Sequence, residues 1–82
     1  MRRIEVRLIR PEQLKGYLVD EFGGVDTGDG WVAGSDWVAH FVEGEPVQIG
    51  TVTVPVLFVE FDGPREADAA LFLSRKAMRG GG

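Results

Sequence analysis

The residues from 47 to 61 form the longest apolar extended run in the sequence, and the run is apolar on both faces of a strand. Alternate residues of a strand point to opposite sides of a sheet. One face would carry Val52, Val54, Val56 and Phe58, and the other Leu57, Val59 and Phe61. Such a strand needs apolar cover on both sides. A chain of 82 residues has little material for two covering layers.

The first third of the chain shows one strand, one helix and one loop. Residues 3–9 alternate apolar and polar side chains, which predicts a strand with one buried face. Residues 11–22 begin with a proline, place apolar side chains at helical spacing and end before a double glycine, which predicts a helix. The glycine- and aspartate-rich residues 23–30 are typical of a flexible loop.

The remaining chain predicts a hairpin followed by a helix. From Trp31 the pattern is extended, with Trp37, Ala39 and Phe41 on one side and Val38, His40 and Val42 on the other. Residues 34–36 interrupt this run as a bulge or a second small turn. Residues 43–46 are expected to reverse the chain into the apolar run, which the glycine at position 50 can interrupt. Residues 64–79 have an acidic start and a basic end, which favours a helix.

These elements predict an α+β domain over residues 1–79, followed by a flexible glycine tail over residues 80–82. The order is strand, helix, strand, strand, helix. It gives a small antiparallel sheet of three or four strands with two helices on one face. This arrangement resembles a ferredoxin-like split βαβ unit that lacks its last strand. The likeness concerns the fold and implies no function.

The two-sided apolar strand also predicts self-association. Two helices cover one face of a small sheet, so the second face needs another cover. The simplest cover is the same face of a second subunit, which predicts a homodimer or higher homo-oligomer. The residues expected in this interface are Val52, Val54, Val56 and Phe58. The alternative is a sheet that curls enough to bury both faces within one chain.

Composition limits the partners. The net charge of −4 argues against binding that depends on phosphate neutralisation, so nucleic acid is an unfavoured partner. The sequence has no apolar run long enough for a signal peptide or a membrane span, which predicts a cytoplasmic protein. Cysteine is absent, and Asn and Gln are scarce. Scarce amides favour a thermophilic source, or else reflect a GC-rich genome.

The segment from 23 to 36 and the strand beside it hold the candidate ligand residues. They are Asp26, Asp29, Trp31, Trp37 and His40. The tryptophans offer flat apolar surface, and His40 is the one side chain that ordinarily titrates near neutral pH. No cofactor, metal site or catalytic residue is assigned, because no motif for one is present. The expected function is a non-catalytic interaction or small-ligand-binding module.

Two other function classes stay open. The first is a small enzyme that uses Asp26 or His40, and residues 25–28, Val-Asp-Thr-Gly, resemble the Asp-Thr-Gly core of aspartic proteases. The second is a carrier, because the terminal Arg79-Gly80-Gly81-Gly82 resembles the tails of ubiquitin-like modifiers and sulfur carriers. That resemblance implies a diglycine that enters an activating enzyme. The alternative for the glycines is a simple helix stop.

Overall fold

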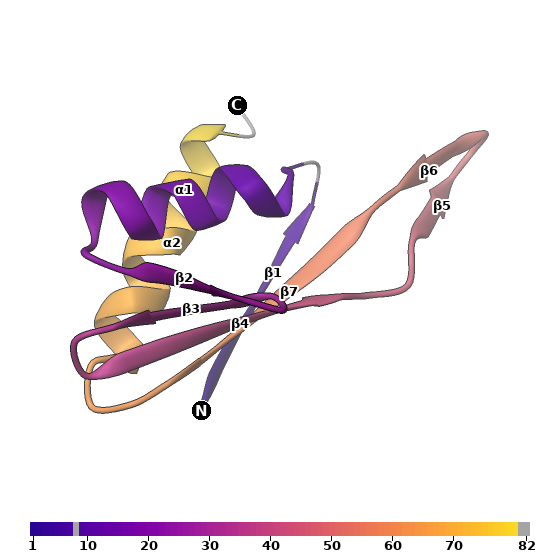
Figure 1. The fold of residues 1–82 in the computed structure, drawn as a ribbon. Coiled ribbons are helices and arrows are strands. Elements are labelled where there is room, and N and C mark those ends of the chain that lie inside the picture. Colours follow the sequence, from indigo (N-terminus) through magenta and orange to yellow (C-terminus); the bar gives the residue numbers. More distant parts are fainter. Residues whose placement is uncertain (8, 81–82) are drawn as a thin grey trace.

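The computed structural model describes residues 1–7 and 9–80, with the side chains of residues 79 and 80 left aside. Its elements are β1 Arg2–Arg7, α1 Pro11–Glu21, β2 Val25–Gly28, β3 Trp31–Gly34, β4 Trp37–Glu43, β5 Val47–Ile49, β6 Val52–Val54, β7 Val56–Asp62 and α2 Glu66–Gly80. An antiparallel five-stranded sheet has the order β1-β7-β4-β3-β2, and β5 pairs with β6 in a separate two-stranded sheet (Figure 1). Leu8 of the predicted strand 3–9, and Gly81 and Gly82 of the predicted tail, lie outside the described residues.

The predicted ferredoxin-like sheet of three or four strands is wrong, because the described chain builds five strands in the main sheet and two in the smaller one. The extra edge strand comes from residues 23–30, which were interpreted as a loop. Gly28, Asp29 and Gly30 all have positive φ, at 91°, 54° and 83°. Glycine and aspartate tolerate this backbone region. These residues therefore close a tight hairpin between β2 and β3 instead of forming a flexible segment.

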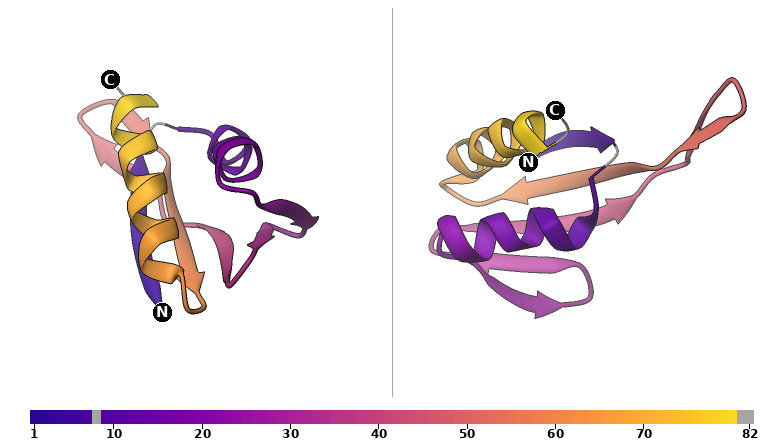
Figure 2. Two further views of the ribbon diagram at one scale, coloured as in Figure 1. Left: turned by 90° about the vertical axis from the view of Figure 1, so that its left-hand side faces the viewer. Right: turned by 90° about the horizontal axis from the view of Figure 1, so that it is seen from above.

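A second difference lies in the position of the chain reversal. It was predicted at residues 43–46, but β4 and β7 stay paired as far as Glu43 and Leu57, and the two segments continue together into β5 and β6. The turn comes at Gly50, which has a φ of 62°. Residues 47–54, here named the arm, project beyond the helices (Figures 1 and 2). The arm contributes to a long molecule, with principal extents of 42, 22 and 20 Å.

Both helices cover the same face of the five-stranded sheet (Figure 2). The predicted alternation in β4 is confirmed, since Trp37, Ala39 and Phe41 are all buried. They pack in one core with side chains from the helices and from β1, β3 and β7, among them Val6, Leu14, Leu18, Val32, Leu57, Val59, Phe61, Ala69 and Leu73. Burying one large apolar side chain stabilises a fold by about 1.5–3 kcal/mol. This shared core is the main force that fixes the helices on the sheet.

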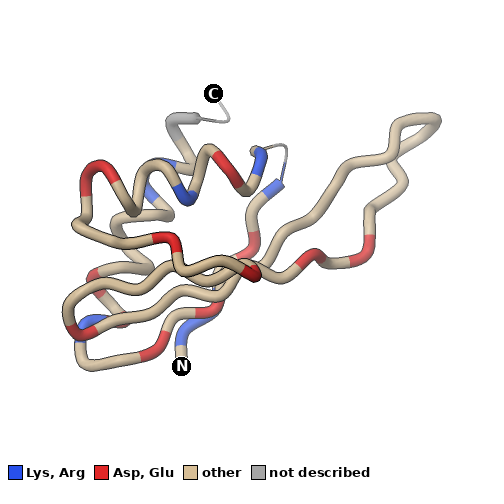
Figure 3. Tube along the Cα trace, viewed as in Figure 1, with Lys and Arg blue, Asp and Glu red and all other residues tan. Residues whose placement is uncertain are grey.

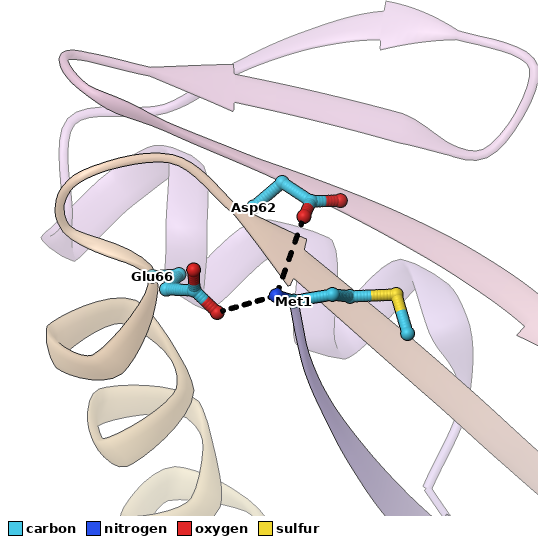
Figure 4. A network of polar contacts seen from close by, with 3 residues as sticks. All are labelled: Met1, Asp62 and Glu66. Carbon is cyan, nitrogen blue, oxygen red and sulfur yellow. Dashed lines mark ion pairs between the residues drawn. The ribbon is translucent and has the colours of Figure 1, made fainter.

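Polar contacts join the helices to each other and to the sheet. Lys76 of α2 and Glu21 of α1 form an ion pair with Nζ and Oε1 2.6 Å apart. The Met1 ammonium lies 3.2 Å from the Glu66 carboxylate at the start of α2, and 3.7 Å from Asp62 at the end of β7 (Figure 4). Exposed ion pairs of this kind contribute at most about 1 kcal/mol each. They align the elements, while the core supplies most of the stability.

Candidate binding surfaces

The sheet face that points away from the helices carries four side chains at one level across four strands. Arg3 lies opposite Glu60, Glu60 opposite His40, and His40 opposite Trp31. The Arg3 Nη1 and His40 Nδ1 atoms are 4.0 and 3.9 Å from the two Glu60 carboxylate oxygens. The Trp31 and His40 rings stack, with centroids 4.1 Å apart and planes 6° from parallel. These four residues are named the polar row.

Apolar side chains lie on both sides of the polar row. Phe58 of β7 is opposite Val42 of β4, and the Arg3 guanidinium carbon lies 4.5 Å from the centroid of the Phe58 ring. On the other side Val38 of β4 is opposite Ala33 of β3. These four apolar side chains are half-buried, although no helix lies over this face (Figure 2). The open face is therefore an apolar surface with paired charges at its centre.

Only two of the five predicted ligand residues share a site. Trp31 and His40 are together on the open face, whereas Trp37 is in the core against Phe22, with ring centroids 5.5 Å apart. The two tryptophans point to opposite faces because the chain turns between Gly34 and Trp37 and starts a new strand. Asp26 accepts a hydrogen bond of 2.9 Å from the Gly28 backbone N–H. Asp29 lies in the turn that follows, so neither aspartate joins the polar row.

The arm has one apolar and one polar face. Val47 is opposite Val54 and Ile49 opposite Val52, while Gln48 and Thr53 form the polar pair between them. The Thr53 hydroxyl donates a 3.1 Å hydrogen bond to the Gln48 side-chain oxygen. At the base Val54 is only 7% exposed, but at the tip Ile49 and Val52 are 57% and 59% exposed. The apolar tip is thus left in solvent.

No charged residue occurs between Glu45 and Glu60, so the whole arm is uncharged. Figure 3 shows acidic residues along the chain before the arm and none within it. In a sequence with 27% charged residues, this stretch stands apart from the rest of the surface. An exposed apolar segment without charge is typical of a surface that is buried by a partner.

A groove of about 490 Å³ lies at the base of the arm. Its walls come from the start of α1 and from the two chain segments that enter and leave the arm. Most of the lining is apolar, with Arg10 and Glu43 as its charged members, and it comprises Ile9, Arg10, Pro11, Glu43, Gly44, Pro46, Pro55, Val56 and Leu57. This groove was not predicted, because segments that are distant in the sequence form it. Pro11 was interpreted only as a helix start and Pro46 only as part of a chain reversal, and no role was assigned to Pro55.

The predicted interface residues do not form one flat face. Val52 and Val54 belong to the arm, Val56 lines the groove, and Phe58 lies on the open face. The strand is divided at Pro55, which has no backbone N–H to donate to a sheet ladder. Residues that alternate regularly in sequence therefore separate into three neighbouring surfaces.

The described part of the chain was also searched for metal-binding clusters and for membrane-spanning helices. Across residues 1–7 and 9–80, no three His, Cys, Asp or Glu side chains gather where they could hold a metal ion. In the same part of the chain, neither α1 nor α2 combines the length and the apolar composition that a bilayer crossing requires.

Comparison with known proteins identifies a family. A search of curated proteins finds no match. A family model described as "Archaeal MoaD-like protein" matches residues 2–82, which is nearly the whole sequence. The match includes the arm, the open face and the C-terminal glycines. Because this match spans residues 2–82, the chain belongs to the archaeal MoaD-like protein family.

Proposed function

We propose that this protein is a non-catalytic interaction module that assembles with further copies of itself. One observation carries the proposal. The apolar run that predicted two-sided cover has helices on only one side, and its continuation into the arm ends in two apolar side chains that are more than half exposed. Apolar surface of this kind is stabilised when a partner removes it from water.

Charge favours a second copy as the partner. The chain has a net charge of −4, so two copies repel each other over most of their surfaces. The arm has no charge, and the charges at the centre of the open face are paired within the polar row. These surfaces are the places where two copies approach with the least repulsion.

The surroundings of the two candidate catalytic residues support structural roles. One ring face of His40 is occupied by the stacked Trp31 ring, and its Nδ1 faces the Glu60 carboxylate. Asp26 lies on the edge strand β2, where its carboxylate accepts the Gly28 N–H. An enzyme that uses either residue would lose turnover in Asp26→Asn or His40→Ala with its fold intact. An interaction module would show at most a change in stability.

The direct test is the mass of the assembly. Native mass spectrometry and sedimentation equilibrium of the purified chain over a wide range of concentration should show a dimer or a larger closed assembly. A chain that stays monomeric at every concentration would contradict the proposal. Extra bound mass on the monomer would instead favour a small-ligand-binding module.

A carrier function is a second candidate, and the family match favours it because the match extends over Gly80, Gly81 and Gly82. In this reading the C-terminal carboxylate carries a transferable group. Intact-mass measurement of the chain isolated from its native cells should then show an added group at Gly82. Deletion of Gly81 and Gly82 should abolish that modification and leave the free energy of unfolding unchanged, since α2 already ends at Gly80.

A further inference from the structure

We infer that two copies of this chain exchange arms, and that the apolar tip of each arm, Ile49 and Val52, packs into the groove at the base of the other. This inference rests on the proposed self-assembly and names the surfaces that produce it. It starts from the arm itself. A two-stranded hairpin is at best marginally stable in water unless its apolar face packs on something.

The body of the protein covers only the base of the arm. Val54 is buried there, while Ile49 and Val52 on the same face remain exposed. Along an extended strand the tip at Val52 is about 13 Å from Val56 in the groove, so the tip does not reach the groove of its own chain. The tip and the groove are therefore two apolar surfaces that one copy leaves separate.

Two-fold symmetry brings these surfaces together. When two arms lie side by side in opposite directions, the tip of each arm meets the base of the other. In a two-fold dimer every contact between one residue and another occurs twice. The groove lies at the base, beside Pro46 and Pro55, and it has an apolar lining suited to Ile49 and Val52. Its volume of about 490 Å³ lies within the usual range for binding clefts.

Charge supports a second copy over an acidic or basic partner. The arm tip that enters the groove has no charge, so it neither repels nor pairs with Arg10 and Glu43 of the groove. Both charged side chains can remain in contact with water. The open edges of β5 and β6 also offer unpaired backbone groups to a neighbouring arm. Arms that pair edge to edge would satisfy these groups and bury the tips in one step.

The first test removes apolar surface from the tip alone. Ile49→Thr combined with Val52→Thr keeps β-branched side chains, which favour strands, but adds hydroxyl groups. The matched control is Val25→Thr, which makes the same kind of change at a residue that is 63% exposed on β2. The arm variant should weaken dimerisation at least about tenfold in sedimentation equilibrium, while the control retains the wild-type dissociation constant. Circular dichroism should show that both variants keep the native fold.

The second test uses the absence of cysteine from the sequence. Glu43 lies in the groove and is paired with Leu57 on the neighbouring strand. Leu57 is five residues from Val52 along that strand, so positions 43 and 52 of one chain are about 16 Å apart. A disulfide requires Cα atoms within about 7 Å. A mixture of Val52→Cys and Glu43→Cys chains should therefore oxidise to a covalent heterodimer on non-reducing gels, whereas each variant alone should not.

The outcomes separate the two claims. A wild-type chain that is monomeric at all concentrations overturns both the proposed function and the arm exchange. A dimer that survives the Thr substitutions, or that is lost in Val25→Thr instead, overturns the arm exchange and leaves self-assembly intact. A covalent dimer from Val52→Cys alone would also overturn it, because the tips would then meet each other.

Discussion

At the scale of single residues, Gly34 is required by the side chain that lies over it. A Cβ atom at this position would lie 2.1 Å from the Trp37 ring. This ring is only 2% exposed, so it is held in the core. We expect Gly34→Ala to lower the free energy of unfolding by about 1–3 kcal/mol, because the ring must shift within a packed core. Urea unfolding measures this loss. An unchanged midpoint would show that Trp37 can move without cost.

Gly16 provides the opposite case. It lies inside α1, and a Cβ atom there would meet nothing within 4 Å. We expect Gly16→Ala to raise the free energy of unfolding by about 0.5–1 kcal/mol, because alanine loses less backbone entropy in a helix. The same urea experiment should give shifts of opposite sign for the two substitutions. A loss of stability in Gly16→Ala would show that another element packs closely on this glycine.

The two tryptophans show how far the sequence predicts the face of the sheet on which a side chain lies. Regular alternation correctly placed Trp37 with Ala39 and Phe41, all of which are buried. It did not place Trp31 relative to Trp37, because residues 34–36 were consistent with either a bulge or a turn. The structure has a turn, with Asp36 at a φ of 67°, and this detail decides that the candidate ligand residues face opposite ways.

At the scale of elements, the strand that sequence missed is the one that buries nothing. All four residues of β2 are exposed, so no apolar alternation marks it. It forms because Gly28 to Gly30 turn the chain back and its backbone pairs with β3. By contrast, α1 and the long paired strands carry periodic apolar side chains, and the sequence predicted them. The alternation of apolar and polar residues that predicts a strand arises from burial of one face, so an exposed edge strand lacks it.

Trp31 of β3 and Trp37 of β4 lie on opposite faces of the sheet, which predicts a difference in how strongly a quencher reduces their fluorescence. Trp31 is 40% exposed on the open face, whereas Trp37 is 2% exposed in the core. Acrylamide should quench the emission of Trp37→Phe, in which only Trp31 remains, and should barely quench Trp31→Phe. Strong quenching of Trp31→Phe would contradict the buried position of Trp37. The contacts proposed for the arm exchange lie at the arm tip and the groove and include no residue of the polar row. Quenching of Trp31 should therefore also be independent of protein concentration.

At the scale of the whole molecule, the sequence predicted that β7 needs two covers but not where the second one is required. The prediction treated the apolar residues that follow Gly50 as one strand. Pro55 instead divides the apolar run into an arm, which turns at Gly50, and a sheet strand. Uncovered apolar surface therefore lies on the tip of the arm as well as on the open face of the sheet. The groove is a tertiary feature of α1 and the arm base, and no local pattern of residues encodes it.

Shortening the arm tests the assembly without touching the core. Replacing residues 48–53 with Asn-Gly joins Val47 to Val54, which already lie opposite each other, through a two-residue hairpin turn. The removed residues are exposed, so the free energy of unfolding of the monomer should change by less than about 1 kcal/mol.

The readout is the dependence of Tm on protein concentration. A protein that folds and dimerises is stabilised by mass action, so the Tm of the wild-type chain should rise with concentration. The shortened chain keeps the groove and Val54 but has no tip to exchange, so its Tm should be the same at every concentration. If its Tm still rises with concentration, the copies associate through another surface. The open face around Phe58 and the polar row would then be the first interface to test, because it is an apolar sheet surface that the helices leave uncovered.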